Sequence, residues 1–241
     1  MFVAASTRCF PDLCLDAAIA QLGDLEFTAV EIMIHEELPQ LKPSQVAADF
    51  AYAEQQCRYT HRLTPVAISF DTQAPEREYY QQFAACCRLA KAIKVATITV
   101  RSSELGTPFN AEVERLRALV AIAALEGCRV GLLTEAGRMT QDPNTTVVLC
   151  NNVKGLGVTL DPSHYIYGPH GGASYEQVMK YVYHVRLRDS TRESFQVRVG
   201  QGDVEYGRLV NQLNKYHYNR ALCADIAPMP EVDQLAELRK M

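Results

Sequence analysis

Acidic side chains close apolar runs in the second half of the sequence, and a histidine follows one of them. Glu135 ends RVGLLTE, Asp161 ends GLGVTLD, and Asp225 lies near the end of RALCADI, while His164 follows Asp161 by three residues. Carboxylates and an imidazole can hold a divalent cation or move protons on a substrate. Asp161 could instead cap a turn and His164 lie on the surface, the commoner role of an isolated Asp-x-x-His. The elements that carry these residues decide between the two interpretations.

Short apolar runs rich in β-branched residues predict eight strands. They span residues 2–6, 29–34, 63–70, 95–100, 129–135, 155–161, 181–187 and 220–226. Helical patterns lie between most of them, for example at 43–59, 75–91 and 110–125. Such alternation indicates a parallel sheet with right-handed crossovers. Eight units in 241 residues fit a single (β/α)8 TIM barrel, one domain over residues 1–241. No Gly-x-Gly-x-x-Gly follows the first strand, which argues against a dinucleotide-binding fold.

The composition is that of an ordinary globular chain, with 48% hydrophobic residues, 22% charged residues and a formal net charge of −4. The negative charge argues against binding nucleic acid through its phosphates. No apolar run is long enough to span a membrane, and the start, MFVAASTRCF, lacks the features of a signal peptide. We therefore expect a cytoplasmic protein. The eight cysteines include no Cys-x-x-Cys pair, so we expect reduced, buried thiols rather than disulfides or zinc ligands.

Chemistry in a TIM barrel takes place at the carboxyl ends of its strands. There, residues 129–226 resemble the xylose isomerase-like barrel superfamily, which contains sugar and sugar-phosphate isomerases and epimerases, hydroxypyruvate isomerases, inosose dehydratases and endonuclease IV. Its pattern is an acid after the fifth strand, Asp-x-x-His after the sixth, His-x-His-x-Lys-Asp on the seventh, a Gly-x-Gly loop and a glutamate after the eighth. This sequence has, in that order, Glu135, Asp161-Pro-Ser-His164, His184-Val-Arg-Leu-Arg-Asp189, Gly200-Gln-Gly202 and Asp225.

The resemblance implies a divalent metal held at four positions, which correspond here to Glu135, Asp161, Arg186 and Asp225. Arginine has no lone pair to offer a metal, and Asp225 is one methylene shorter than glutamate. His184 shares the inward direction of Arg186 but lies about 6.6 Å deeper along the strand. The carboxylates of Glu135, Asp161 and Asp225 could still hold Mg²⁺, Mn²⁺, Co²⁺ or Zn²⁺. A guanidinium among them would repel the ion or take its place, so we expect Arg186 to form a salt bridge with at least one of the acids.

The resemblance also implies an isomerase or epimerase of a carbohydrate or its derivative, in which two acids move a proton through an enediolate. Glu135 and Asp225 match those catalytic positions, and Arg186 could stabilise the enediolate in place of the metal. We expect substrate-binding side chains at His164, Arg186, Arg188 and Arg198. These arginines could equally form no more than a solvated surface.

Two other classes of function remain to be weighed. A non-catalytic ligand-binding or accessory barrel is favoured by Arg186, whereas the retention of Glu135, Asp161 and His164 argues against it. An endonuclease of the superfamily needs further zinc ligands, but the strand at 95–100 is followed by Arg101-Ser102 and the loop FQVRVG lacks Asp-x-His. We expect a small carbohydrate or sugar-acid partner, with no nucleic acid or membrane partner. The sequence leaves the exact substrate and homo-oligomerisation open.

Overall fold

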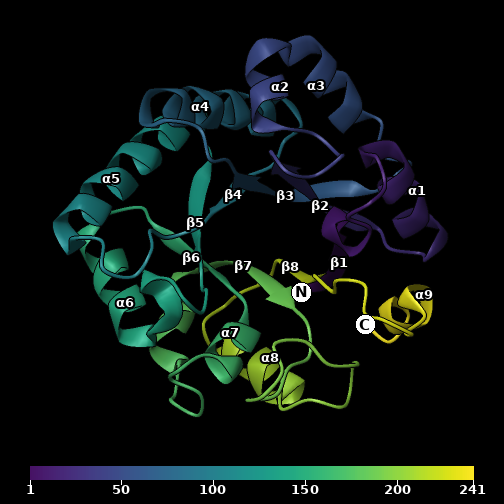
Figure 1. Ribbon diagram of the computed structural model, residues 1–241, viewed down its shortest axis with the longest axis vertical. Coiled ribbons are helices and arrows are strands. Elements are labelled where there is room, and N and C mark those ends of the chain that lie inside the picture. Colours follow the sequence, from purple (N-terminus) through teal and green to yellow (C-terminus); the bar gives the residue numbers. More distant parts are fainter.

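Eight parallel strands close into a barrel in the computed structural model, which describes residues 1–241 (Figure 1). Each strand pairs with the next along the chain, and β8 pairs with β1. The strands are β1 Phe2–Ser6, β2 Ala29–His35, β3 Thr64–Asp71, β4 Thr97–Val100, β5 Arg129–Leu133, β6 Gly157–Leu160, β7 Val182–Leu187 and β8 Ala221–Ala224. The single (β/α)8 TIM barrel predicted from the sequence is confirmed.

Helices surround the barrel on its outside (Figure 1). The α-helices are α1 Leu15–Asp24, α2 Pro43–Ala48, α3 Phe50–Arg58, α4 Glu76–Ala92, α5 Phe109–Leu125, α6 Pro143–Asn152, α7 Pro162–Tyr167, α8 Tyr206–Lys215 and α9 Gln234–Leu238. Short 3₁₀ helices are η1 Thr7–Cys9, η2 Met139–Gln141 and η3 Glu176–Tyr181. The helical pattern at 43–59 forms two helices, because Asp49 leaves the helical conformation and caps α3 by accepting the Tyr52 N–H. None of the helices has the length and apolarity needed to cross a bilayer.

The apolar core lies mainly where the helices pack on the barrel, in one cluster of 50 buried residues. A separate cluster of small residues lies on β1, β2 and β8: Ala4, Ala29, Ala221 and Cys223. Next to this cluster the barrel interior is polar, with buried Glu31, Thr99, Thr159, His184 and Arg186. Branched apolar side chains usually fill this space in TIM barrels. The polar groups must therefore satisfy one another, as the hydroxyls of Thr99 and Thr159 do at 2.8 Å.

Candidate active site

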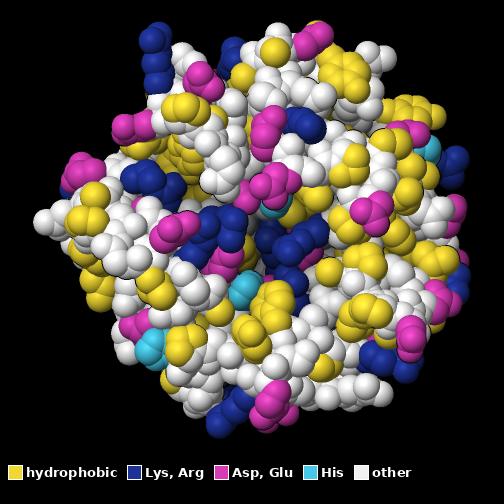
Figure 2. Space-filling model, viewed as in Figure 1, with side chains coloured by type: hydrophobic (Ala, Val, Ile, Leu, Met, Phe, Trp, Pro, Cys, Tyr) yellow, Lys and Arg dark blue, Asp and Glu magenta, His cyan; other side chains and the backbone are white.

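A cavity of about 320 Å³ opens at the carboxyl ends of the strands. Its walls include Arg8, His35, Arg101, Glu135, His164 and Arg186. Figure 2 shows basic, acidic and histidine side chains gathered around the hollow at the centre of this face. A concave site at this end of a TIM barrel, lined by a few charged groups, is where substrates bind in such folds.

Arg101, directly after β4, joins two carboxylates on one side of the cavity. Its Nε donates to Glu135 Oε2 at 2.9 Å, its Nη2 donates to Glu135 Oε1, and its Nη1 donates to Asp71 Oδ2 at 3.2 Å. Arg138 adds a second cation, with Nε 3.4 Å from Glu135 Oε2. Burial alone would raise the pKa of Glu135, but the hydrogen bond and charge of Arg101 outweigh it and hold the pKa below its ordinary value. Glu135 is therefore ionised at neutral pH, on the wall of the cavity.

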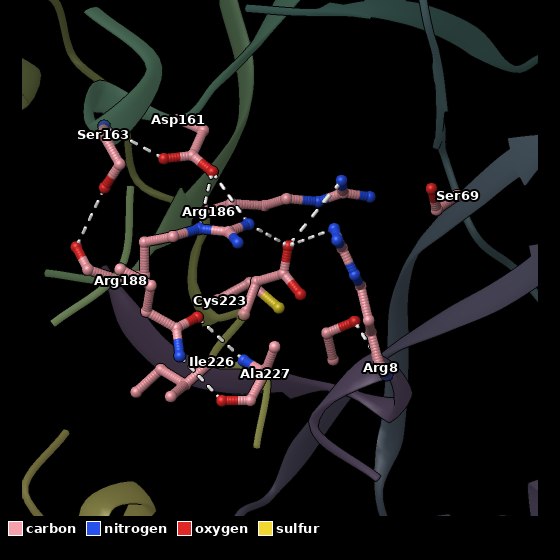
Figure 3. Close-up of polar contacts among 12 residues, drawn as sticks. Arg8, Ser69, Asp161, Ser163, Arg186, Arg188, Cys223, Ile226 and Ala227 are labelled. Atoms are coloured by element: carbon pink, nitrogen blue, oxygen red, sulfur yellow. Dashed lines mark hydrogen bonds and ion pairs between the residues drawn. The ribbon is translucent and has the colours of Figure 1, made fainter. Parts of the chain in front are cut away.

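Arg188, directly after β7, joins the other two strand-end acids out of contact with solvent. Its Nη2 lies 3.0 Å from Asp161 Oδ2 and 2.6 Å from Asp225 Oδ2, and both acids are fully buried. The guanidinium groups of Arg8, Arg186 and Arg188, which are labelled in Figure 3, lie 3.5, 3.9 and 2.6 Å from Asp225 Oδ2. Burial would raise the pKa of Asp225, but these three charges hold it below its ordinary value. A guanidinium thus occupies the position between Asp161 and Asp225 that a cation would take, and this arrangement does not fit a divalent metal.

Arg186 reaches across the barrel from β7 to Glu31 on β2. Its Nη2 donates to Glu31 Oε1 at 2.6 Å and its Nε to Glu31 Oε2 at 3.1 Å, between two buried side chains. The expected salt bridge to a strand-end acid is a longer contact, 3.9 Å from Nη1 to Asp225 Oδ2. No sequence motif identified Glu31 as a site residue. The one sequence feature that could have done so is its position as an acid inside the apolar run AVEIMI. The pairing of β2 with β3 shifts register between Val30 and Glu31, an irregularity that can re-aim a side chain.

Two histidines on the cavity wall are neutral at neutral pH. Nδ1 of His164 accepts the Ala136 N–H at 3.1 Å, so the proton of the neutral ring is on Nε2. Nε2 of His35 lies 3.0 Å from Ser69 Oγ. Burial lowers the pKa of His164. Burial, together with the charges of Arg186 and Arg8, lowers the pKa of His35 to about 3. Both rings can therefore form hydrogen bonds with a substrate hydroxyl as uncharged groups.

The loop after β7 contributes Phe195 to the cavity wall. Asp189 Oδ2 accepts the backbone N–H groups of Gly200 and Gly202, at 2.8 and 3.0 Å. A Cβ on Gly202 would lie only 2.1 Å from Asp189 Oδ1, so the second glycine of Gly-Gln-Gly is required by this close approach. The loop places the Phe195 ring 4.5 Å from the His164 ring and 4.6 Å from Cζ of Arg188, centroid distances that indicate direct packing.

The structure divides the predicted site residues into three groups. Glu135, His164 and Arg186 line the cavity, whereas Asp161, Asp225 and Arg188 are buried and do not line it. Asp161 also accepts the Ser163 N–H at 3.0 Å, so it caps α7 as well as binding Arg188. Arg198 does not line the cavity: its side chain is 53% exposed and binds Glu237 at 3.1 Å.

Most of the residues that line the cavity come from the first half of the chain and were not among the predicted site residues; Arg8, His35 and Arg101 are three of them. Of these, His35 and Arg101 directly follow predicted strands, and this position is the sequence feature that could have identified them as site residues. A second cavity, of about 550 Å³, adjoins the first beside α4 and α5. Phe70, Asp71 and Arg101 line both cavities, so the Arg101–Asp71 ion pair belongs to the wall between them.

Comparisons with known proteins identify the fold. The family model described as xylose isomerase-like TIM barrel matches residues 17–241, and none of the curated proteins matches the sequence. The probable 3-DHS dehydratase AsbF from Bacillus anthracis has a TM-score of 0.75 at 14% identity, over 100% of this chain and 97% of that chain. The 3-keto-D-glucoside 4-epimerase YcjR from E. coli has a TM-score of 0.75 at 15% identity, over 100% of both chains. A xylose isomerase-like TIM barrel protein from Mycobacterium smegmatis, in complex with magnesium, has a TM-score of 0.78 at 14% identity, over 99% of this chain and 94% of that chain.

Proposed function

The chain belongs to the xylose isomerase-like TIM barrel family, and from this membership and the geometry of the barrel mouth we propose that it isomerises a small sugar, sugar phosphate or sugar acid by proton transfer. The observation that carries the proposal is an ionised carboxylate, Glu135, on the wall of a cavity that also presents Arg186 and His164. The cavity volume of about 320 Å³ is at the small end of ligand sites, which suits a single sugar unit.

Glu135 is the proposed base. It removes the proton from the carbon beside the substrate's carbonyl group, the C–H electron pair forms a carbon–carbon double bond, and the carbonyl oxygen becomes an enediolate oxygen. The protonated Glu135 then returns the proton to the neighbouring carbon. His164, with its proton on Nε2, passes a proton from one substrate oxygen to the other. These steps balance as the interconversion of an α-hydroxy aldehyde and the isomeric ketone.

Arg186 supplies the positive charge beside the enediolate. Its Nε and Nη2 are fixed on Glu31, while Nη1 lies 3.9 Å from Asp225, beyond hydrogen-bond distance, and can donate to substrate. A pre-oriented donor to an oxyanion contributes about 2.7–4 kcal/mol to transition-state stabilisation. Because Arg188 fills the space between Asp161 and Asp225, the proposed reaction uses no metal there.

The position of Asp225 favours isomerisation over epimerisation. Inverting a carbon centre with two bases requires one base on each face of the substrate, whereas one base suffices for transfer between adjacent carbons. Asp225 is fully buried and does not border the cavity. A shared role of Asp225 in proton transfer, as the sequence suggested, would require its carboxylate to leave Arg188. The simpler role is to orient the arginines that face the substrate.

A second candidate function is ligand binding without catalysis. One observation favours it: each of the three strand-end acids, Glu135, Asp161 and Asp225, is paired with an arginine. A carboxylate fixed by two hydrogen bonds from Arg101 is a weaker base than a free one.

Proton exchange at carbon separates the two functions. The protein is incubated in D₂O, with and without EDTA, together with a panel of aldoses, ketoses, their phosphates and sugar acids. Deuterium at the carbons next to the carbonyl is followed by NMR. We expect exchange with at least one compound and a loss of about a hundredfold or more in Glu135→Gln. Glu205→Gln, which changes an exposed acid paired with Arg208, is the matched control and should not alter the rate. Binding detected by thermal shift without any exchange would support the non-catalytic barrel, and exchange that EDTA abolishes would contradict the metal-free reaction.

A further inference from the structure

Three side chains of metal-ligating type meet in the barrel interior, one layer below the mouth. They are Glu31 on β2, His184 on β7 and Cys223 on β8, all buried, and one ligand atom from each lies within 4.8 Å of the others. None of them lines the mouth cavity. Arg186, which does line it, binds Glu31 and so lies between the cluster and the substrate site.

Two of the three distances between ligand atoms in the cluster are those expected around a shared ion. Oε2 of Glu31 lies 3.4 Å from His184 Nε2 and 3.5 Å from Cys223 Sγ. Zinc bonds of about 2.0–2.2 Å to nitrogen or oxygen and about 2.3 Å to sulfur place neighbouring ligands of a tetrahedral site about 3.3–3.6 Å apart. Both measured separations therefore match the edges of such a tetrahedron.

His184 provides an independent observation. Its Nε2 is buried and has no hydrogen-bond partner. The Glu31 oxygen at 3.4 Å lies beyond the usual range for an N–H···O hydrogen bond. Buried polar atoms are nearly always satisfied, so an orphaned imidazole nitrogen that faces a carboxylate and a thiol requires an explanation.

We propose that Glu31, His184 and Cys223 bind one transition-metal ion of the zinc class. Mixed oxygen, nitrogen and sulfur donors suit Zn²⁺ and Co²⁺ and do not suit Mg²⁺ or Mn²⁺, which prefer oxygen alone. The site is distinct from the acids at the strand ends, and it does not depend on the reaction proposed above. It also revises the expectation that Cys223 is only a buried structural thiol.

Arg186 orients the proposed ligand Glu31, as residues that hydrogen-bond to metal ligands do in known metal sites. Arg186 binds both oxygens of Glu31, Oε1 through Nη2 and Oε2 through Nε, and Oε2 also faces His184 and Cys223. Burial and the nearby Glu31 raise the pKa of the Cys223 thiol well above its ordinary value. Metal binding must therefore displace the thiol proton, and the affinity should increase with pH.

The first measurement is the metal content of the purified protein, expressed with added zinc and washed with chelator. We expect about one zinc per chain in the wild type and almost none in Cys223→Ala or His184→Gln. Cys150→Ala, which removes another buried thiol, on α6, is the matched control and should keep its zinc. Two independent ligand variants keep the test decisive if one of them fails to fold.

Cobalt spectroscopy then identifies the ligands. Protein unfolded and refolded with Co²⁺ should show sulfur-to-cobalt charge-transfer absorption and the visible bands of tetrahedral cobalt. In Cys223→Ala the charge-transfer band should vanish and the cobalt affinity fall by more than about a hundredfold, since even outer-group changes cost 10–100-fold. Zinc-free wild type after zinc-supplemented expression and refolding would overturn the proposal. So would cobalt bound without a sulfur band, or with equal affinity in Cys223→Ala, because the ion would then be held elsewhere.

Discussion

Two arginines at the barrel mouth each join two carboxylates, and they differ chiefly in burial. Arg101 joins Glu135 and Asp71 with 34% of its side chain exposed, whereas Arg188 joins Asp161 and Asp225 with 2% exposed. Because Arg101 is partly exposed, it can exchange a carboxylate partner for a substrate group. Arg188 is fixed, because any rearrangement would leave an unpaired charge in the protein interior.

The position of each arginine in the barrel explains the difference. Arg188 follows β7, between the strands that carry Asp161 and Asp225, and the Phe195 ring packs on its guanidinium. Arg101 follows β4 and binds acids after β5 and at the end of β3, where the two cavities adjoin. The buried Arg188 cluster thus holds the barrel together, whereas the partly exposed Arg101 cluster presents Glu135, the proposed base, to the cavity.

Removing the buried arginine should have the largest effect on stability. Arg188→Met leaves two buried carboxylates without their main partner, and we expect the free energy of unfolding to fall by about 3–5 kcal/mol. Urea denaturation measures the change. Arg208→Met, at an exposed ion pair with Glu205, is the control and should change stability by less than about 0.5 kcal/mol. A loss below about 1 kcal/mol in Arg188→Met would show that the two arginine pairings are equivalent.

A partly buried histidine on the cavity wall should make stability depend on pH. His35 has a pKa of about 3 in the folded protein and an ordinary value when unfolded, so the unfolded state binds more protons at intermediate pH. Stability should therefore fall as the pH falls from about 6.5 toward 3, by up to about 1.4 kcal/mol per unit for this one group. Urea denaturation between pH 6.5 and 4.5 measures the slope, and His35→Gln should reduce it. An unchanged slope would mean that His35 is protonated in the folded state.

Removing the partly exposed Arg101 should have the smallest effect on stability and a clear effect on the pKa of Glu135. Arg101→Met should lower the free energy of unfolding by about 1 kcal/mol or less. Without Arg101, burial dominates and the pKa of Glu135 should rise, since the arginine is the main group that lowers it. An NMR titration of the Glu135 carboxyl carbon measures this shift without a known substrate. A stable variant with an unshifted pKa would show that Arg138 alone sets the ionisation of Glu135.

The sequence predicted the barrel because its strand ends follow from apolar runs and their order. It also predicted Glu135, His164 and Arg186, which line the cavity, because each follows or lies on such a run. The partners could not be predicted in the same way. Spacing along a strand gives the direction of a side chain, but the pairing of Arg186 with Glu31 depends on which strands face each other across the closed interior.

The ion pair between Glu31 and Arg186 also has a consequence for how the chain folds. The two residues are 155 positions apart in sequence, and both are enclosed by the finished barrel. When only the first strands have assembled, Glu31 lacks the arginine that pairs with it in the folded protein, because Arg186 is on β7. The N-terminal half therefore cannot form its complete interior by itself, and both ends of the chain must assemble together. Such long-range closure is slow and cooperative, so a half-barrel cut from this protein should remain loosely ordered until its complement is added.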